Sequence, residues 1–267
     1  MLTREELHLL LNAGMRQRNA LTIRILLATA VRSTELYKAK WEHVDLDEAR
    51  WHIPKSKTGT AMDIPLALIA VGWFKELREM AAESAYVLPA HSRGRAARQG
   101  GDTHVSKDTI REAIGYWLDG EKPAVRRFTP HDLRSTMKSH IRALGVPRDI
   151  SEMCLNHKLS GVEGICDRHT YFGERKEALE KWALFLVACG AGATWCRLPG
   201  RKVLRTETDW QMSRTYRRRG IRGPVDKPDN SALTIYLSLR SGTLRAANAH
   251  RLSTRSVRPA GKAEAVV

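Results

Sequence analysis

The sequence comprises 267 residues, 42% of them hydrophobic, so the chain is long enough and apolar enough to bury a substantial core. It holds no run of eighteen apolar residues, and its opening, MLTREELHLL, lacks the layout of a secretion signal, so we expect a cytoplasmic protein with no membrane partner. The 45 Lys and Arg residues exceed the 29 Asp and Glu residues, and the net charge of +16 favours a polyanionic partner, with nucleic acid first.

The chain begins with helical patterns. Thr3 and Glu6 are spaced as in a reciprocal capping box, which predicts a helix with leucines on one face. A second helix is predicted over residues 19–31, NALTIRILLATAV. A third is predicted from residue 33 or 34 and is expected to include Trp41.

The apolar period then changes to two, which is typical of strands. RWHIP and AMDIPL alternate on either side of the turn-rich KSKTGT, so residues 50–66 are predicted to form an antiparallel hairpin with Lys57 at its tip. An amphipathic helix is predicted over residues 71–81, a basic glycine-containing loop over residues 91–104, and a capped helix over residues 106–118.

Two more helices and a short one complete the pattern. FTPHDLRSTMKSHIRALG is helical, with Pro130 suited to its first turn and Gly145 to its end. Pro147 is expected to begin a short helix, and residues 174–188 to form the last one. The predicted fold is therefore α+β, mainly helical with a small antiparallel β-sheet, over residues 1–189.

Residues 190–267 differ in character. They hold 16 Lys and Arg against 5 Asp and Glu, with many Gly and Pro and no sustained apolar period. Only residues 231–239, SALTIYLSL, read as a strand. We therefore expect a basic, disordered C-terminal extension behind one folded domain.

Three features of the domain have anion-binding chemistry. His131 and Arg134 are three residues apart on a predicted helix, so an imidazole and a guanidinium can reach one small anion. Arg32 lies beside a predicted helix N-terminus, where backbone N–H groups favour anions. Lys57 can act as a mobile proton donor at the hairpin tip. Each feature taken alone is more typical of an ordinary solvated surface.

Taken in order, these features resemble a known family. ATAVRSTELYKAKWEHVDLD, WHIPKSKTGTAMDIPL, FTPHDLRSTMKSHIRALG, CLNHKLSGVEGICDRHTY and ERKEALEKWA are similar in order and spacing to motifs of the tyrosine recombinases, specifically the integrases of prophages and genomic islands. The resemblance covers residues 1–189 and implies the tyrosine-recombinase (DNA breaking-rejoining enzyme) catalytic fold. It also implies double-stranded DNA and other integrase protomers as partners, with strand exchange through a 3′-phosphotyrosyl bond and no cofactor or metal.

The resemblance further implies a role for each site residue. Arg32 and Arg134 would hold the non-bridging oxygens of the scissile phosphate and stabilise the charge of the transition state. Lys57 would protonate the departing 5′ oxygen, and His131 would assist proton transfer at the nucleophile. His157 would donate a hydrogen bond to the phosphate.

The nucleophile expected from this resemblance is missing from its usual place. In the family a tyrosine commonly lies nine residues after the histidine of the LGH-like motif, and nine residues after His157 is Cys166. A second tyrosine of such sequences is present as Tyr171. On a continuous helix, Tyr171 would be turned by about 140° from the face on which the expected tyrosine lies, and advanced by about 7.5 Å. The side chain of Cys166 is at the expected position but is shorter than that of a tyrosine. We therefore expect an integrase domain impaired at its nucleophile, with Tyr171 and Cys166 as the candidates.

Two alternatives stay open. Cys154-x-x-His157 and Cys166-x-x-His169 offer four ligands of the types that zinc prefers, which would make a zinc-stapled module. The chain also starts at the first helix of the catalytic domain, without the DNA-binding domains that usually precede it, so we expect an N-terminal truncation. A non-catalytic, DNA-binding remnant of an integrase is therefore the other alternative.

Overall fold

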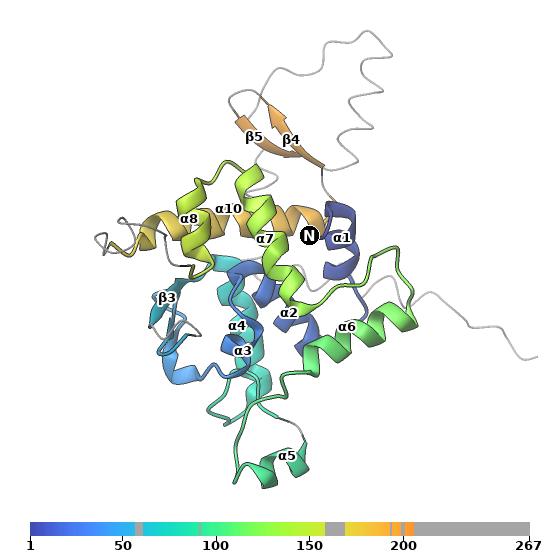
Figure 1. Ribbon diagram of the computed structural model, residues 1–267, viewed down its shortest axis with the longest axis vertical. Helices are drawn as coiled ribbons and strands as arrows, with labels where there is room; N and C mark the ends of the chain where they lie inside the picture. The colour runs from blue at the N-terminus through green and yellow to red at the C-terminus, as the bar shows by residue number, and fades with distance from the viewer. Residues whose placement is uncertain (57–60, 91, 158–168, 193, 199–200, 206–267) are drawn as a thin grey trace, which may run out of the picture. The chain divides into compact units, whose positions relative to one another are not determined.

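The computed structural model describes residues 1–56, 61–90, 92–157, 169–192, 194–198 and 201–205. These residues form a mainly helical fold with a small antiparallel sheet, as predicted (Figure 1). The first elements are α1 (Arg4–Leu11), α2 (Gln17–Thr29), α3 (Ser33–Tyr37) and the 3-10 turn η1 (Trp41–His43). Trp41 was expected on the third helix. It lies beyond that helix instead, because the chain becomes extended at Lys40, which pairs with Tyr86 in an isolated bridge.

The sheet has the strand order β1-β2-β3, with β1 (Val44–Asp45), β2 (Arg50–Ile53) and β3 (Met62–Pro65) all antiparallel. Trp51 pairs with Ile64 and both are buried, whereas Arg50 and His52 are exposed. This alternation confirms the predicted hairpin, since successive side chains of a strand point to opposite faces. The hairpin tip with Lys57 lies outside the described residues.

The remaining helices are α4 (Leu68–Ala81), α5 (Arg93–Arg98), α6 (Thr109–Gly120), α7 (Pro130–Ala143), α8 (Arg148–Cys154) and α10 (Phe172–Gly190). The short helix α5 corrects the prediction of a loop over residues 91–104. Its first turn is stabilised because the Ser92 hydroxyl accepts a hydrogen bond from the backbone N–H of Arg95. Gly145, with φ of +82°, follows the end of α7 and supplies the left-handed conformation expected there.

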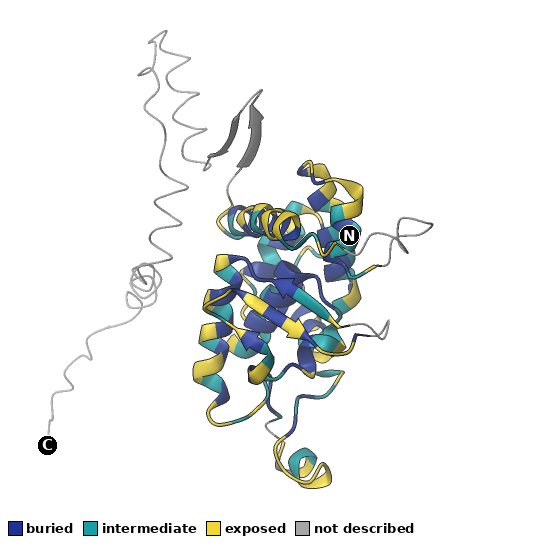
Figure 2. Ribbon diagram, turned by 90° about the vertical axis from the view of Figure 1, so that its left-hand side faces the viewer, coloured by how far each residue is buried: buried dark blue, intermediate teal, exposed yellow. Residues whose placement is uncertain are grey.

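The core surrounds α2, whose residues are buried on nearly every side. Helices α4, α6, α7 and α10 all contact it, and their buried faces turn inward while their outer faces are exposed (Figure 2). One fixed point is Trp182 on α10, which donates its indole N–H to the carbonyl of Leu27 at 2.7 Å. No helix in the described part of the chain combines the length and the hydropathy needed to cross a membrane.

A second hairpin lies within the segment for which a disordered extension was predicted. Strands β4 (Thr194–Leu198) and β5 (Arg201–Arg205) pair in antiparallel register, with Thr194 opposite Arg205. Sequence analysis missed this hairpin, although the Pro-Gly dipeptide between the two strands is a turn signal. Residues 206–267, which include the strand predicted over residues 231–239, lie outside the described residues.

Candidate active site

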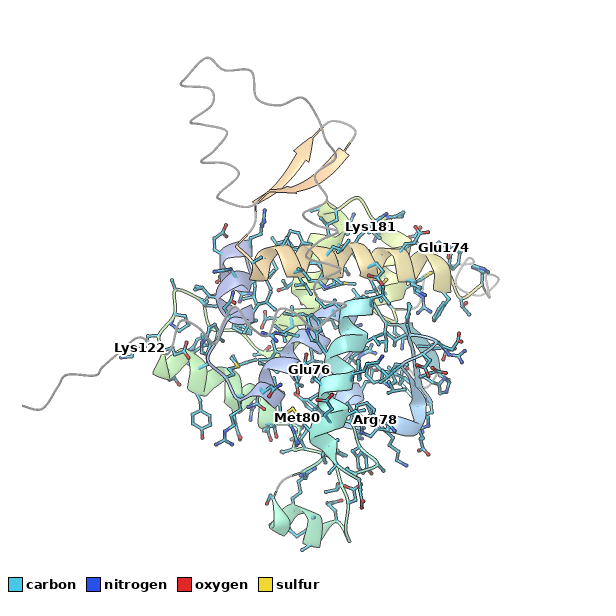
Figure 3. All side chains as sticks on the ribbon, turned by 180° about the vertical axis from the view of Figure 1, so that it is seen from behind. Glu76, Arg78, Met80, Lys122, Glu174 and Lys181 are labelled. Atoms are coloured by element: carbon cyan, nitrogen blue, oxygen red, sulfur yellow. The ribbon has the colours of Figure 1, made fainter. Side chains whose placement is uncertain are left out.

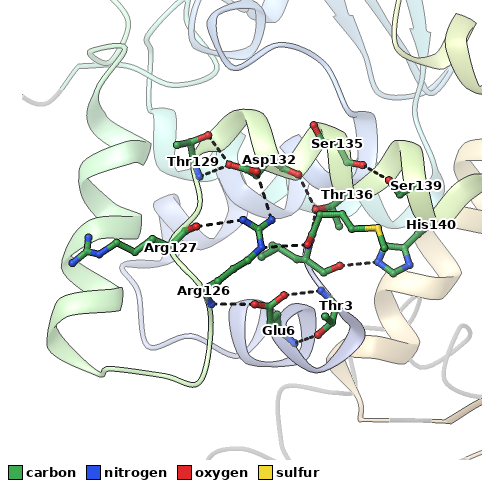
Figure 4. Close-up of polar contacts among 12 residues, drawn as sticks. Thr3, Glu6, Arg126, Arg127, Thr129, Asp132, Ser135, Thr136, Ser139 and His140 are labelled. Atoms are coloured by element: carbon green, nitrogen blue, oxygen red, sulfur yellow. Dashed lines mark hydrogen bonds and ion pairs between the residues drawn. The ribbon is translucent and has the colours of Figure 1, made fainter.

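The first two turns of α7 carry His131 and Arg134, and local capping fixes where the helix begins. Thr129 and Asp132 form a reciprocal capping box, and proline occupies the first helical position. Arg126 forms an ion pair with Asp132 at 3.5 Å, and its backbone N–H donates to Glu6 at 3.0 Å (Figure 4). The start of α7 is thereby connected to the start of α1.

The N-terminal segment contacts α7 a second time, one turn further along. Leu2 donates its backbone N–H to Thr136 Oγ1 at 2.8 Å, and its carbonyl accepts from His140 Nε2 at 2.8 Å (Figure 4). Because Leu2 is fully buried, these bonds are shielded from water. Helix α7 is therefore held along one side over three turns.

Arg134 connects three segments that are far apart in the sequence. Its side chain is buried, with 6% of the residue exposed, and it donates to the carbonyl of Ala30 at 2.5 Å and to the carbonyl of Leu155. Ala30 lies two residues before Arg32, and Leu155 lies two residues before His157. The Arg134 guanidinium thus brings together the segments that bear the other two predicted anion-binding residues.

Arg32 lies at the N-cap of α3 and is oriented by Glu35. Its Nη1 is 3.1 Å from Glu35 Oε1, and its backbone N–H donates to Glu35 Oε2 at 2.8 Å. Burial and, after it, the positive charge of Arg32 lower the pKa of Arg134 to about 10. The Arg134 guanidinium is therefore still charged at neutral pH and is repelled by the positive charge of Arg32, and an anion bound between the two would relieve that repulsion.

His157 is oriented by a carboxylate that sequence analysis did not single out. The Nδ1–H of His157 donates to Glu152 Oε2 at 2.6 Å, and the other oxygen of Glu152 is 2.7 Å from Lys138 Nζ. Burial raises the pKa of Glu152, but the hydrogen bonds from Lys138 and His157 outweigh it and lower this pKa overall. A carboxylate can only accept, so Nδ1 of His157 carries a proton and Nε2 is the nitrogen left for a ligand, to which it can donate only in the imidazolium form.

The other predicted site residues are placed differently. His131 is exposed on the first turn of α7. Tyr171 has a left-handed backbone (φ 48°, ψ 36°) just before α10, its N–H donates to His169 Nδ1 at 3.2 Å, and the two rings meet edge to face with centroids 4.6 Å apart. Lys57 and Cys166 lie outside the described residues. The roles of these four residues stay predictions.

A cavity of about 520 Å³ lies beside His157, between the sheet and the start of α10. Its lining includes His157 and His169 but not Tyr171. The remaining lining residues are Glu48, Arg50, His52, Ala61, Met62, Asp63, Met153, Asn156, Thr170, Phe172 and Arg175. Sequence analysis singled out neither Arg175 nor Asn156, because neither belongs to a motif that indicates chemistry.

The zinc alternative requires Cys154 and His157 as ligands together with Cys166 and His169. Cys154 is 3% exposed, and burial raises the pKa of its thiol to about 12, which disfavours the thiolate that binds metals. Within the described ranges, no group of three or more His, Cys, Asp or Glu residues is arranged to hold a metal ion. Cys166 itself lies outside those ranges.

Comparison with known proteins identifies the class to which this fold and site belong. The model of the Phage integrase family matches residues 1–162, and the chain therefore belongs to the phage integrase family. The matched residues include Arg32, His131, Arg134 and His157 and end before Cys166. The family predicted from the sequence is thus confirmed.

Two curated proteins and one solved structure illustrate the similarity. Prophage integrase IntA of Escherichia coli strain K12 is 23% identical over 170 residues, covering 62% of this chain and 38% of that protein. Prophage integrase IntZ of the same strain is 26% identical over 165 residues, covering 60% and 38%. The integrase from mycobacterium phage Brujita superposes with a TM-score of 0.52 at 18% identity, covering 67% of this chain and 56% of that one. This likeness confirms the predicted tyrosine-recombinase fold. The chain spans less than two fifths of the length of the two curated relatives.

Proposed function

We propose that this domain binds double-stranded DNA and holds one backbone phosphate between Arg32, Arg134 and His157, as the DNA-binding and strand-exchange site of a phage-type tyrosine recombinase. The observation that carries the proposal is the pair of hydrogen bonds from Arg134 to the carbonyls of Ala30 and Leu155. They place two cationic side chains and an oriented imidazole on neighbouring segments. Such a set of preorganised donors matches the charge of a phosphodiester in its transition state.

The chemistry of site-specific recombination assigns a part to each residue. The nucleophile bonds to phosphorus while the bond from phosphorus to the 5′ oxygen breaks, so the bond energy is kept in a covalent 3′ adduct. His131 takes up the proton of the nucleophile, and Lys57 delivers a proton to the departing 5′ oxygen. Arg32 and Arg134 stabilise the added negative charge, and the loss of one such donor lowers the rate by about 10²- to 10³-fold.

The proposal extends to partners and location. The domain acts in the cytoplasm on duplex DNA, together with other integrase protomers bound to the same DNA. The Lys and Arg residues of the basic C-terminal extension predicted over residues 190–267 add phosphate contacts of no sequence preference. Separate DNA-binding domains would supply the choice of attachment site.

A second candidate function, DNA binding without strand cleavage, is favoured by the surroundings of the nucleophile candidates. Cys166 stands where the tyrosine is expected, and the Tyr171 ring contacts His169 instead of lining the cavity beside His157. We therefore infer an integrase domain that is impaired at its nucleophile.

The test uses a nicked DNA duplex that traps the covalent intermediate, analysed on a denaturing gel. We expect the unmodified protein to bind the duplex without a covalent adduct, and Cys166→Tyr to form one when upstream DNA-binding domains are supplied. An adduct of the unmodified protein that Tyr171→Phe abolishes would show that Tyr171 is the nucleophile. A protein that does not bind duplex DNA at low salt would refute the proposed function altogether.

A further inference from the structure

The cavity beside His157 has a lining rich in cationic and hydrogen-bond-donating side chains that the proposed reaction does not use. Arg50 lies on β2 and Arg175 on the first turns of α10, so two segments 125 positions apart in sequence contribute guanidinium groups. His52 and His169 add two imidazoles. A concave site with this lining suits an oxyanion better than a neutral or cationic ligand.

Arg175 is buried more completely than an arginine normally is. Only 4% of the residue is exposed, and its Nη2 donates to the carbonyl of Asp63 at 2.9 Å. Its guanidinium also lies 5.8 Å from the ring centroid of Phe172. Its Nε–H, however, has no hydrogen-bond partner among the described residues. A buried cation with an unused donor is costly in free energy, and an anion in the cavity that this residue lines would offset that cost.

Asn156 supplies a second unused donor in the lining of the same cavity. Its Nδ2 is buried and has no hydrogen-bond partner within the described part of the chain. Its backbone is left-handed, with φ of +51°, at the turn between α8 and His157. Asn156 directly follows Leu155, whose carbonyl accepts from Arg134. The cavity therefore adjoins the segment that Arg134 binds.

The two carboxylates in the lining accept no hydrogen bond from the unused donors of Arg175 and Asn156. Asp63 accepts one from His52 Nδ1 at 2.7 Å instead. Glu48 is exposed on the turn before β2, where water screens it. Neither carboxylate therefore occupies the two donors that an anion in the cavity would meet.

We propose that this cavity, lined by Arg50, Asn156, His157, His169 and Arg175, binds a second phosphate of the DNA backbone, next to the phosphate held by Arg32 and Arg134. The inference rests on the proposed function, because it assigns a further contact with the same DNA. His157 contributes to both positions, since it borders the cavity and follows the segment bound by Arg134. The second phosphate fixes the register of the strand relative to the nucleophile.

The test is equilibrium binding of the full chain to a short duplex DNA of arbitrary sequence over a range of salt concentrations. Each phosphate contact contributes about 0.9 to the slope of log K against log salt, so Arg175→Gln is expected to lower the slope by about 0.9. Its affinity at low salt is expected to fall about tenfold or more. The matched control is Lys181→Gln, an exposed position further along α10, which should leave both values unchanged (Figure 3).

A second variant keeps the test decisive if loss of the Asp63 contact unfolds Arg175→Gln. Asn156→Asp keeps the size of the side chain, tolerates the left-handed backbone and puts a negative charge where the donor was. We expect a stronger loss of DNA affinity than in Arg175→Gln, with an unchanged circular dichroism spectrum.

Unaltered slope and affinity in Asn156→Asp, or equal losses in Arg175→Gln and Lys181→Gln, would overturn the second phosphate position while leaving the proposed function intact. A parent protein that fails to bind DNA at low salt would overturn both.

Discussion

Replacement of Arg134 by methionine should destabilise the fold as well as the site. The substitution keeps an unbranched side chain of similar length but removes the two hydrogen bonds to the carbonyls of Ala30 and Leu155. Both carbonyls would then lack their hydrogen-bond donor in a buried region, since only 6% of Arg134 is exposed to solvent. The segments that carry Arg32 and His157 would lose their common contact with α7.

The magnitude follows from the two bonds. A hydrogen bond from a charged donor contributes about 1.5–3 kcal/mol, so two bonds correspond to about 3–6 kcal/mol. Methionine avoids the desolvation of the guanidinium, which offsets part of this loss, but it leaves two buried acceptors unsatisfied at about 1–3 kcal/mol each. We therefore expect Arg134→Met to lower the free energy of unfolding by about 3–5 kcal/mol, out of the roughly 5–15 kcal/mol typical of a domain.

Urea unfolding followed by circular dichroism measures this difference. The matched control is Arg142→Met, an exposed position on the last turn of the same helix, which should change the free energy of unfolding by no more than about 0.5 kcal/mol. If Arg134→Met unfolds at the same urea concentration as Arg142→Met, Arg134 does not hold the three segments together and the reasoning fails.

Three further predictions concern other contacts. Glu152→Gln keeps the shape but removes the charge that two cationic side chains bind, so the free energy of unfolding at neutral pH should fall by about 1–3 kcal/mol. The fold lowers the pKa of Glu152 below its ordinary value of 4.5. The difference in unfolding free energy should therefore be complete above pH 4.5 and shrink as the pH falls through the lowered pKa of the folded state. Urea titrations at several pH values that gave a constant difference would contradict this prediction. Thr3→Ala should cost about 1 kcal/mol through loss of the capping box, with Thr3→Ser costing less in the same thermal unfolding experiment. Burial raises the thiol pKa of Cys154 and Cys189, so peptide mapping should find both unmodified by iodoacetamide in the native protein and labelled after unfolding; rapid native labelling would contradict their burial.

Elements that depend on local signals were predictable from the sequence. The limits of α7 follow from Thr129 and Pro130 at its start and Gly145 after its end, because caps act on the backbone within a few residues. The hairpin of β2 and β3 follows from its alternation. Helix α5 was missed because its residues, RGRAAR, carry no apolar face, and only the cap at Ser92 indicated a helix.

The candidate site was predictable only as a set of residue types. Arg32, Arg134 and His157 were chosen by their motifs, but the groups that join them are the backbone carbonyls of Ala30 and Leu155, which no sequence pattern distinguishes. Arg175 contacts a carbonyl 112 positions away, so its burial depends on how α10 packs against β3. Such contacts arise from tertiary packing and leave no periodic trace in the sequence.

The buried position of Leu2 has a consequence for any polypeptide joined ahead of this domain. Met1 is 62% exposed, so a preceding segment or an affinity tag can leave the surface there, yet the very next residue is anchored to α7 through both its amide and its carbonyl. Tension or rotation in such a segment therefore reaches the helix that bears His131 and Arg134 without passing through a flexible linker. Fusions at the amino end are mechanically coupled to α7, and a spacer of several residues would be needed to uncouple them.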